Sequence, residues 1–206
     1  MDRETSLALL IGYVLGSIPF GLLLGLAGGK GDIRKIGSGS IGATNVLRTG
    51  SKPLAALTVI LDCLKGTAAI LIVHTLFERG LLAFGPASHA AAAGAIVGHL
   101  YPVWLKFHGG KGVATLFGVL LALLWQAALV FAVIWLLLIL TIRISSVAGM
   151  TAAISAPITA FVLHDNNLIP MLLGFALLVL WKHRENILRL RKGTEPRIGS
   201  KTSSTA

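Results

Sequence analysis

Cysteine is almost absent from this sequence, because Cys63 is the single cysteine among 206 residues. One thiol can form neither a disulfide within the chain nor a cysteine metal cluster. The histidines on the predicted cytoplasmic side are scattered and lack the carboxylate or thiol neighbours that a metal site needs. We therefore expect no disulfide framework, no metal and no cofactor, and we expect Cys63 to serve packing inside an apolar segment.

Charged residues are also scarce, at 13% of the sequence, whereas apolar residues make up 55% and the mean hydropathy is +0.83. About 20 apolar residues suffice to cross a bilayer as a helix. The sequence therefore predicts an all-α, polytopic membrane protein with no room for a separate soluble domain, so that residues 1–206 form a single domain. The apolar runs are Leu7–Ala27, Leu54–Phe77, Ala90–Leu105, Val113–Ile142, Val147–Leu163 and Leu168–Trp181.

One of these runs, Val113–Ile142, is too long for a single ordinary crossing, because about 30 residues of helix extend ~45 Å. Trp125 and Gln126 lie in its middle. An aromatic ring and an amide are typical of the membrane interface. We expect two short helices joined by a tight turn there, which gives seven transmembrane helices.

The net charge of +10 comes from 18 Lys and Arg against 8 Asp and Glu. With seven helices, most basic residues fall in loops on one side and in the C-terminal segment, whereas Arg3 and Arg79 fall on the other side and Lys65 lies within a helix. Positive loops stay in the cytoplasm. The pattern predicts an outside N-terminus and a cytoplasmic C-terminus, with 193–206 as a flexible tail, and it explains the charge without nucleic acid as a partner.

The first polar loop, Gly37–Gly50, reads GSGSIGATNVLRTG. It formally matches G-x-G-x-x-G, but the dinucleotide fingerprint needs a strand and a βαβ unit, and this loop lies between two membrane segments. Small residues expose backbone N–H groups that can surround an anion, and arginine adds a fixed positive fork. We interpret the loop as a substrate site; the alternative is a flexible connector. Its candidate residues are Ser38, Gly39, Gly42, Thr44, Asn45 and Arg48.

The second polar loop reads KFHGGKGVAT, Lys106–Thr115. It is not a Walker A motif, which needs a further glycine upstream and Ser or Thr directly after the lysine. Gly109 and Gly110 still allow close backbone approach, Lys111 supplies a charge, and a helix expected from Val113 points its N-terminus at the same place. We interpret this loop as a phosphate site; the alternative is a basic interfacial turn that contacts lipid headgroups.

Two further polar segments lie on the same predicted side. Arg143–Ser146 is a short basic turn, which alone indicates only a cytoplasmic loop. In Trp181–Gly193, a continuing helix would place His183, Asn186 and Arg189 on one face. The alternative for this last segment is an amphipathic basic tail on anionic lipid.

Charged residues also occur inside the predicted membrane segments. Asp62 and Lys65 are one helical turn apart within an apolar run. Such groups are usually paired or functional, so an internal ion pair that supports the active face and a direct role both stay open. The G-x-x-x-G pairs Gly12/Gly16 and Gly21/Gly25 are expected to pack helices within the chain.

These segments together resemble the bacterial acyl-phosphate:glycerol-3-phosphate acyltransferase family over nearly the whole chain. The blocks that carry the resemblance are GSGSIGATNVLRTG, GHLYPVWLKFHGGKGVAT and HRENILRL, with Gly16-Ser17-Ile18-Pro19 in the first membrane segment. Many family members have Asn where this chain has Ser40, so no necessary role is assigned to Ser40.

The resemblance implies an integral enzyme of the bacterial inner membrane with seven helices and a cytoplasmic active face. It implies transfer of a fatty acyl group from acyl phosphate to the 1-hydroxyl of glycerol 3-phosphate, which gives lysophosphatidate and phosphate. Oligomeric state and chain-length preference do not follow from it. By resemblance the functional residues are Ser38, Asn45, Arg48, Lys111, Ser146, His183 and Asn186.

The residues are consistent with direct transfer. No G-x-S-x-G elbow is present, and acyl phosphate is activated enough to need no covalent nucleophile. We expect Arg48, Lys111 and Arg189 to hold the phosphates and His183 to be the general base, unless a substrate phosphate takes the proton. Ser38, Asn45 and Asn186 would orient the acceptor and stabilise the oxyanion. The alternative function is a transporter or channel for a phosphorylated metabolite, although no internal repeat supports it.

Overall fold

The structure is a computed structural model that describes residues 2–78 and 84–199. Within these two ranges the secondary structure is helical and no strand occurs, which confirms the all-α prediction. Arg79, Ser200 and Lys201 lie outside the described residues. The chain divides into two compact units, residues 1–128 and residues 129–206, and each is described by itself.

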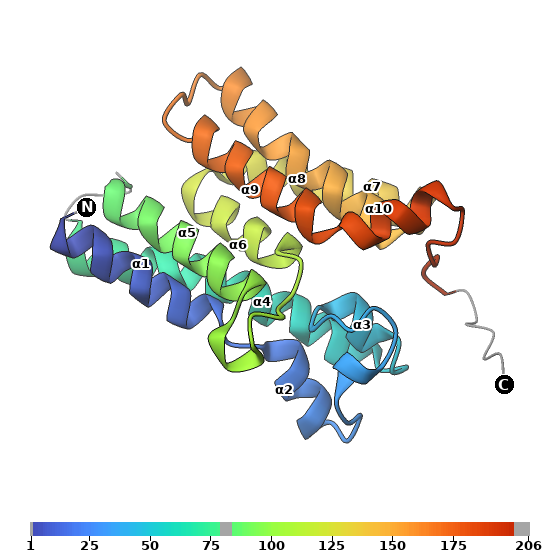
Figure 1. Cartoon of the computed structure of the whole chain (residues 1–206). Helices are drawn as coiled ribbons and strands as arrows, with labels where there is room; N and C mark the ends of the chain where they lie inside the picture. The colour runs from blue at the N-terminus through green and yellow to red at the C-terminus, as the bar shows by residue number, and fades with distance from the viewer. Residues whose placement is uncertain (1, 79–83, 200–206) are drawn as a thin grey trace, which may run out of the picture. The chain divides into compact units, whose positions relative to one another are not determined.

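Unit 1 consists of helices, and two of the loops between them contain its predicted site residues. The first loop, 28–51, contains the short helices η1 and α3, and the second, 101–112, contains η2 (Figure 1). The elements are α1 (Arg3–Gly16), α2 (Phe20–Ala27), η1 (Ile33–Lys35), α3 (Ala43–Leu47), α4 (Lys52–Phe77), α5 (Pro86–Leu100), η2 (Val103–Leu105) and α6 (Val113–Leu123).

Glycines bring α1 and α5 into backbone contact, and the two helices run alongside each other in Figure 1. A β-carbon at Gly12 would lie 2.2 Å from the carbonyl oxygen of Ala91, and one at Gly16 would lie 2.2 Å from that of Ala95. No side chain fits such a gap, so the predicted packing role of Gly12 and Gly16 is confirmed.

The pattern of the first apolar run predicts one helix, but the run forms two. The helix α1 ends at Gly16 and α2 begins at Phe20. Pro19 has no N–H to donate, and its ring disfavours helical conformation at Ile18. Proline therefore breaks the run that the sequence analysis treated as the continuous segment Leu7–Ala27.

The third apolar run also differs from the prediction. The helix α5 starts at Pro86 and ends at Leu100, whereas the sequence predicted Ala90–Leu105. Tyr101 leaves the helical region, with φ −138° and ψ 58°, because the following residue, Pro102, restricts it.

The predicted division of Val113–Ile142 is confirmed. The helix α6 ends at Leu123, the extended residue Leu124 follows with φ −154°, and α7 (Trp125–Thr141) begins at once. The turn lies at the aromatic–amide position that suggested it.

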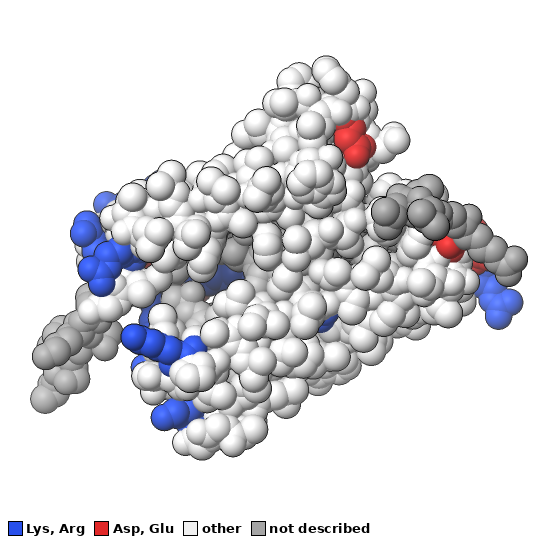
Figure 2. All heavy atoms as spheres, turned by 180° about the vertical axis from the view of Figure 1, so that it is seen from behind, with Lys and Arg blue, Asp and Glu red and all other residues white. Residues whose placement is uncertain are grey.

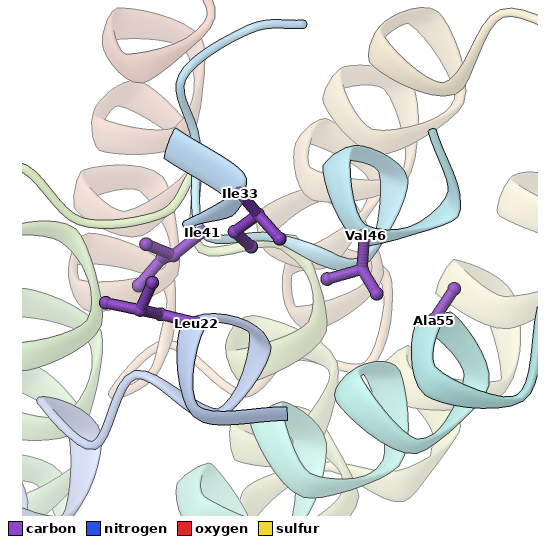
Figure 3. Packing of buried hydrophobic residues seen from close by; sticks show 5 residues of the cluster. All are labelled: Leu22, Ile33, Ile41, Val46 and Ala55. Carbon is purple, nitrogen blue, oxygen red and sulfur yellow. The ribbon is translucent and has the colours of Figure 1, made fainter. Parts of the chain in front are cut away.

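A small core holds the first loop against the helices of unit 1 (Figure 3). Ile33 and Ile41 from the loop and Val46 from α3 pack with Leu22 of α2 and Ala55 of α4. Their side chains are at most 7% exposed. Burying aliphatic side chains of this size stabilises by about 1.5–3 kcal/mol each, so apolar packing fixes a loop that is otherwise polar.

Unit 2 contains most of α7, then α8 (Ser145–Val162), α9 (Ile169–Lys182) and α10 (Arg184–Arg191). The helix α10 follows α9 almost without interruption, with His183 between them (Figure 1). Beyond α10, the N–H of Ile198 donates to the carbonyl oxygen of Arg143 at 2.7 Å. The described part of the predicted flexible tail is thus held against the start of α8.

Among the described residues, three stretches are long and apolar enough to cross a membrane: Arg3–Ala27, Lys52–Phe77 and Ser145–Val162. The shorter apolar helices are α6, α7 and α9. The long and short apolar helices alike carry large exposed side chains, such as Leu76 on α4, Leu140 on α7 and Phe161 on α8. Figure 2 shows a face on which few acidic or basic side chains appear. A soluble protein rarely exposes so much apolar surface, and a lipid-facing one requires it.

Candidate active site

Asn45 organises the first loop of unit 1 from its centre. Its side chain is buried, and Nδ2 donates to the carbonyl oxygens of Ile33 at 2.6 Å and Ser40 at 2.9 Å. Its Oδ1 accepts from the backbone N–H of Ser38 at 3.2 Å and from Arg48 Nη1 at 3.3 Å. The amide therefore holds together the loop that presents Ser38 and Arg48.

Glycine is required where this loop turns back on Asn45. Gly37 and Gly39 have φ values of +55° and +66°, in the left-handed region that favours glycine. A β-carbon at Gly37 would lie 2.5 Å from Asn45 Oδ1 and 2.6 Å from Arg48 Nη1. The loop thus wraps closely around one amide.

The other predicted residues of the first loop lie nearer the surface. Ser38 is half-buried, while Thr44 and Arg48 are exposed on α3 or at its end. Gly42 is the N-cap residue of α3, and its N–H donates to the Ser40 hydroxyl at 3.3 Å. Hydroxyls and one guanidinium therefore line the outer side of a rigid loop.

The second loop of unit 1 is seated on the end of α5. The N–H of Gly110 donates to the carbonyl oxygen of His99 at 3.0 Å, and that of Gly109 donates to Leu100 at 3.2 Å. A β-carbon at Gly109 would lie 2.1 Å from the His99 carbonyl oxygen, and one at Gly110 would lie 2.1 Å from His99 Nε2. Two adjacent glycines are needed because the carbonyl oxygen and the ring of His99 occupy the places that their β-carbons would take.

Lys111 follows this seat directly and is half-buried. Gly112, with φ +87°, then turns the chain into α6 and is its N-cap residue. Positive φ favours glycine here, so the loop fixes the place from which the lysine extends, one residue before the helix begins.

These hydrogen bonds correct one step of the sequence argument. The predicted anion site relied on backbone N–H groups, yet those of Ser38 and Gly42 donate to side chains of their own loop, and that of Gly39 donates to Ile36. Those of Gly109 and Gly110 donate to the end of α5. These five N–H groups therefore shape and seat the loops, and the predicted role in anion binding does not fall to them.

Three predicted residues of unit 2 converge on a carboxylate that the sequence analysis missed. Ser146 Oγ, at the start of α8, donates to Glu195 Oε1 at 2.7 Å. From α10, Asn186 Nδ2 donates to the same oxygen at 2.5 Å, and Arg189 Nε donates to Oε2 at 2.7 Å. The Glu195 side chain is only 4% exposed. The shared face of Asn186 and Arg189 is thus confirmed, but its partner is within the chain.

The electrostatics of Glu195 follow from these contacts. Burial raises the pKa of its carboxyl, but the hydrogen bonds from Asn186, Ser146 and Arg189 outweigh burial and leave the pKa below its ordinary value of 4.5. Charge-assisted hydrogen bonds favour the ionised form. Glu195 is therefore a fixed negative charge that holds α8 and α10 together. A single acid amid basic residues was its only signal in the sequence.

His183 lies at the junction of α9 and α10 and is only 3% exposed. Its Nδ1 is 2.8 Å from the carbonyl oxygen of Val179. A carbonyl oxygen can only accept, so Nδ1 carries the proton in this bond and the neutral ring has its lone pair on Nε2. This tautomer leaves Nε2 as the basic nitrogen, as a general base requires.

The buried ion pair expected within the membrane segment is present. Lys65 Nζ and Asp62 Oδ1 are 2.7 Å apart, and both side chains are almost fully buried. Of the two open interpretations, the contact supports the first, an internal ion pair that supports the active face.

A family model described as "Glycerol-3-phosphate acyltransferase" matches residues 6–193 of the chain. That range includes both loops of unit 1 and the α8 and α10 residues of unit 2. The match therefore covers every residue of the predicted site.

Curated relatives carry the same description. A glycerol-3-phosphate acyltransferase of Mesorhizobium japonicum is 55% identical over 196 residues, which cover 95% of this chain and 96% of the relative. One of Erythrobacter litoralis is 50% identical over 200 residues, 97% of this chain and 98% of the relative.

Two crystal structures of PlsY (YgiH), an integral membrane glycerol 3-phosphate acyltransferase, are similar to this fold. Its glycerol 3-phosphate form has a TM-score of 0.85 and 38% identity, covering 95% of this chain and 96% of that chain. Its lysophosphatidic acid form has a TM-score of 0.82 and 37% identity, covering 95% of each chain.

Proposed function

The chain belongs to the glycerol-3-phosphate acyltransferase family, and on that premise we propose that it transfers a fatty acyl group from acyl phosphate to the 1-hydroxyl of glycerol 3-phosphate. The products are lysophosphatidate and inorganic phosphate, so the reaction is the first acylation of phospholipid synthesis. The observation that carries the proposal is similarity over nearly the full length, which includes every predicted site residue.

The reaction needs positioning and charge stabilisation more than a covalent intermediate. The 1-hydroxyl oxygen attacks the acyl carbonyl carbon, the bond from that carbon to the phosphate oxygen breaks, and phosphate leaves as an anion. The hydroxyl proton must pass to a base. Orienting the two reactants and stabilising the oxyanion supply most of the rate enhancement in such a transfer.

In this proposal, unit 1 supplies phosphate binding. Lys111 and Arg48 are the cations, because the loops fix their starting points and leave both side chains at least partly exposed. Ser38 donates a hydroxyl to the acceptor. Asn45 acts by holding the loop, since its amide is already bonded to Ile33 and Ser40.

His183 and Asn186 are the residues proposed for proton transfer and for orienting the acceptor. His183 Nε2 accepts the hydroxyl proton, with Nδ1 anchored on Val179. Asn186 contributes to orienting the acceptor and is itself fixed by Glu195. The same carboxylate holds Ser146 and Arg189, so these two residues act by keeping the cluster in place.

The membrane arrangement is a further part of the proposal. We expect seven transmembrane segments in the inner membrane, with the N-terminus outside and the C-terminus and the active face in the cytoplasm. Supporting this, both polar loops of unit 1 and the α10 segment are basic. The segments shorter than a full crossing are α5, α6, α7 and α9.

Single cysteines test this arrangement in a background in which Cys63 is replaced by alanine. Lys52→Cys and Asn166→Cys both lie at exposed positions. A membrane-impermeant maleimide added to intact spheroplasts should label Asn166→Cys and spare Lys52→Cys until the membrane is opened. Equal labelling from one side would overturn the orientation.

The activity is tested with purified protein, synthetic acyl phosphate and labelled glycerol 3-phosphate. Lysophosphatidate should form without nucleotide, metal or carrier protein, in an amount equal to the phosphate released. A protein that carries glycerol 3-phosphate across proteoliposomes and forms no lysophosphatidate would instead be the transporter that the same basic loops could also serve.

A further inference from the structure

A pair of buried charges lies below the second loop of unit 1, in a helix apolar enough to cross a membrane. Lys65 Nζ is 2.7 Å from Asp62 Oδ1, and their side chains are 2% and 3% exposed. A buried ion pair is usually no more stabilising than a well-packed apolar pair, because both charges lose their hydration. Its presence therefore calls for another explanation than stability.

The lysine ties α4 to the break between α1 and α2. Lys65 Nζ donates to the carbonyl oxygen of Ile18 at 2.8 Å. Ile18 lies outside both helices because of Pro19, and its carbonyl oxygen accepts a local bond from the N–H of Phe20 at 3.1 Å instead of a regular helical one. The ammonium group is its second donor and also lies 5.7 Å from the ring centre of Phe20.

The carboxylate faces the residue on which the second loop is seated. Asp62 Oδ1 is 3.7 Å from His99 Nδ1, and both side chains are buried. This separation exceeds a hydrogen bond, but the carboxylate attracts the imidazole edge when Nδ1 carries a proton, because little water screens the contact. Asp62 thus favours one orientation of the His99 ring.

His99 passes that orientation to the loop. Its carbonyl oxygen accepts the N–H of Gly110 at 3.0 Å. Its ring occupies the space beside Gly110, where a β-carbon would lie 2.1 Å from Nε2. Rotation or loss of the ring would remove the surface against which Gly110 lies, and Lys111 is the next residue.

We propose that Lys65, Asp62 and His99 are positioning residues that fix the backbone of Gly109–Gly112 and thereby the place of the Lys111 ammonium group. Lys65 balances the carboxylate and anchors it to the α1–α2 break. Asp62 holds the His99 ring, and the ring supports the loop. The expected effect on substrate affinity rests on the proposed function, whereas the expected effect on the loop does not.

The test uses the full-length protein in lipid nanodiscs. The double variant Asp62→Asn, Lys65→Met removes both charges together, so that no unpaired charge stays buried. The single variant His99→Gln removes the ring. Thr58→Val is the matched control, since Thr58 is buried on the same helix and donates only within it, to the carbonyl oxygen of Leu54.

The first readout is amide hydrogen exchange, which requires no catalytic activity. Both test variants should raise exchange about tenfold in peptides covering 106–113 and leave peptides of α8 and α9 unchanged. Thr58→Val should match the wild type throughout. The proposal would be overturned if both test variants fold and the exchange rate of their loop equals that of the wild type. Global unfolding of both would overturn it too, because the residues would then support the whole fold.

The second readout separates binding from turnover. Fixing a phosphate-binding lysine predicts that KM for glycerol 3-phosphate rises about tenfold while kcat falls less. A fall in kcat alone would contradict the assignment. If the wild type lacks acyl transfer while the two test variants still show faster loop exchange, the proposed function is refuted and the positioning role stands.

Discussion

Asn186 and Glu195 are joined across nine residues by a hydrogen bond from Nδ2 to Oε1, at 2.5 Å. The same carboxylate accepts from Ser146 and Arg189. One acid therefore fixes a predicted active-site amide and links the start of α8 to α10, although it lies in a segment that the sequence suggested was a flexible tail.

Replacing that acid should loosen the cluster. Glu195→Ala removes the acceptor of three hydrogen bonds. A hydrogen bond to a charged group contributes about 1.5–3 kcal/mol net, and the variant regains part of this because the carboxylate no longer loses its hydration on burial. We expect the free energy of unfolding to fall by roughly 2–4 kcal/mol, measured by thermal unfolding in detergent. Glu185→Ala removes an exposed carboxylate from the first turn of α10, outside the cluster, and should change stability little. Equal effects of the two changes would contradict the role of Glu195.

Stability should also depend on Glu78 at acid pH. Its carboxylate accepts from the N–H groups of Ala87 and Ser88 at the start of α5. Burial raises the pKa of Glu78, but hydrogen bonds from the Ser88 hydroxyl, the Gly85 backbone and their neighbours outweigh it and bring the pKa from 4.5 to about 2.

Since the pKa is lower in the folded state, the carboxylate stabilises the fold above pH 4.5, and that contribution declines as the pH falls toward 2. Thermal unfolding between about pH 6 and about pH 3 should show this loss in the wild type. Glu78→Gln should flatten the dependence, and Glu4→Gln, at an exposed position of α1, should not. An unchanged slope in Glu78→Gln would refute the link.

A methyl group at position 109 should displace the second loop. Gly109→Ala places a β-carbon 2.1 Å from the carbonyl oxygen of His99, and backbone cannot move aside cheaply. We expect at least about a tenfold loss of acyl transfer with helical content retained. Gly174→Ala, on α9, meets nothing within 4 Å, so it should keep activity and gain slightly in helix propensity. Full activity in Gly109→Ala would show that the loop does not need its close contact with the end of α5.

The base assignment predicts a specific kinetic change. His183→Ala should lower kcat by about 10²–10⁴-fold with a smaller change in KM, and it should remove the histidine limb of the pH–rate profile. His164→Asn, an exposed position with φ +59° that asparagine tolerates, is the control. A pH–rate profile that keeps its shape in His183→Ala would assign the proton to a substrate phosphate instead.

Much of this fold could be predicted because long apolar runs leave few alternatives to membrane helices. Trp125 and Gln126 located the turn between α6 and α7, since polar groups are costly inside lipid. The break at Pro19 was missed because hydropathy does not register a missing N–H donor. Pro102 ended α5 early for a similar reason, through its effect on Tyr101.

The site was predictable in its residues and less so in its contacts. Glycine-rich loops with Arg48 and Lys111 indicated phosphate binding by charge and spacing. Spacing could not show that the N–H groups of Gly109 and Gly110 donate hydrogen bonds to the end of α5. Nor could it show that Asn45 is hydrogen-bonded to Ile33, twelve residues upstream. Glu195 was missed because a single acid in a basic tail has no periodic signal.

The central claim is that Lys111 holds a substrate phosphate in an acyl transfer reaction. The most direct measurement is kcat/KM for glycerol 3-phosphate in purified Lys111→Ala, with Lys106→Gln, an exposed lysine of the same loop, as the control. Loss of a charge-assisted contact worth about 1.5–3 kcal/mol predicts a fall of roughly 10- to 150-fold, while the control stays near wild type. Wild-type kcat/KM in Lys111→Ala would contradict the account and leave the second loop as a basic turn at the membrane surface.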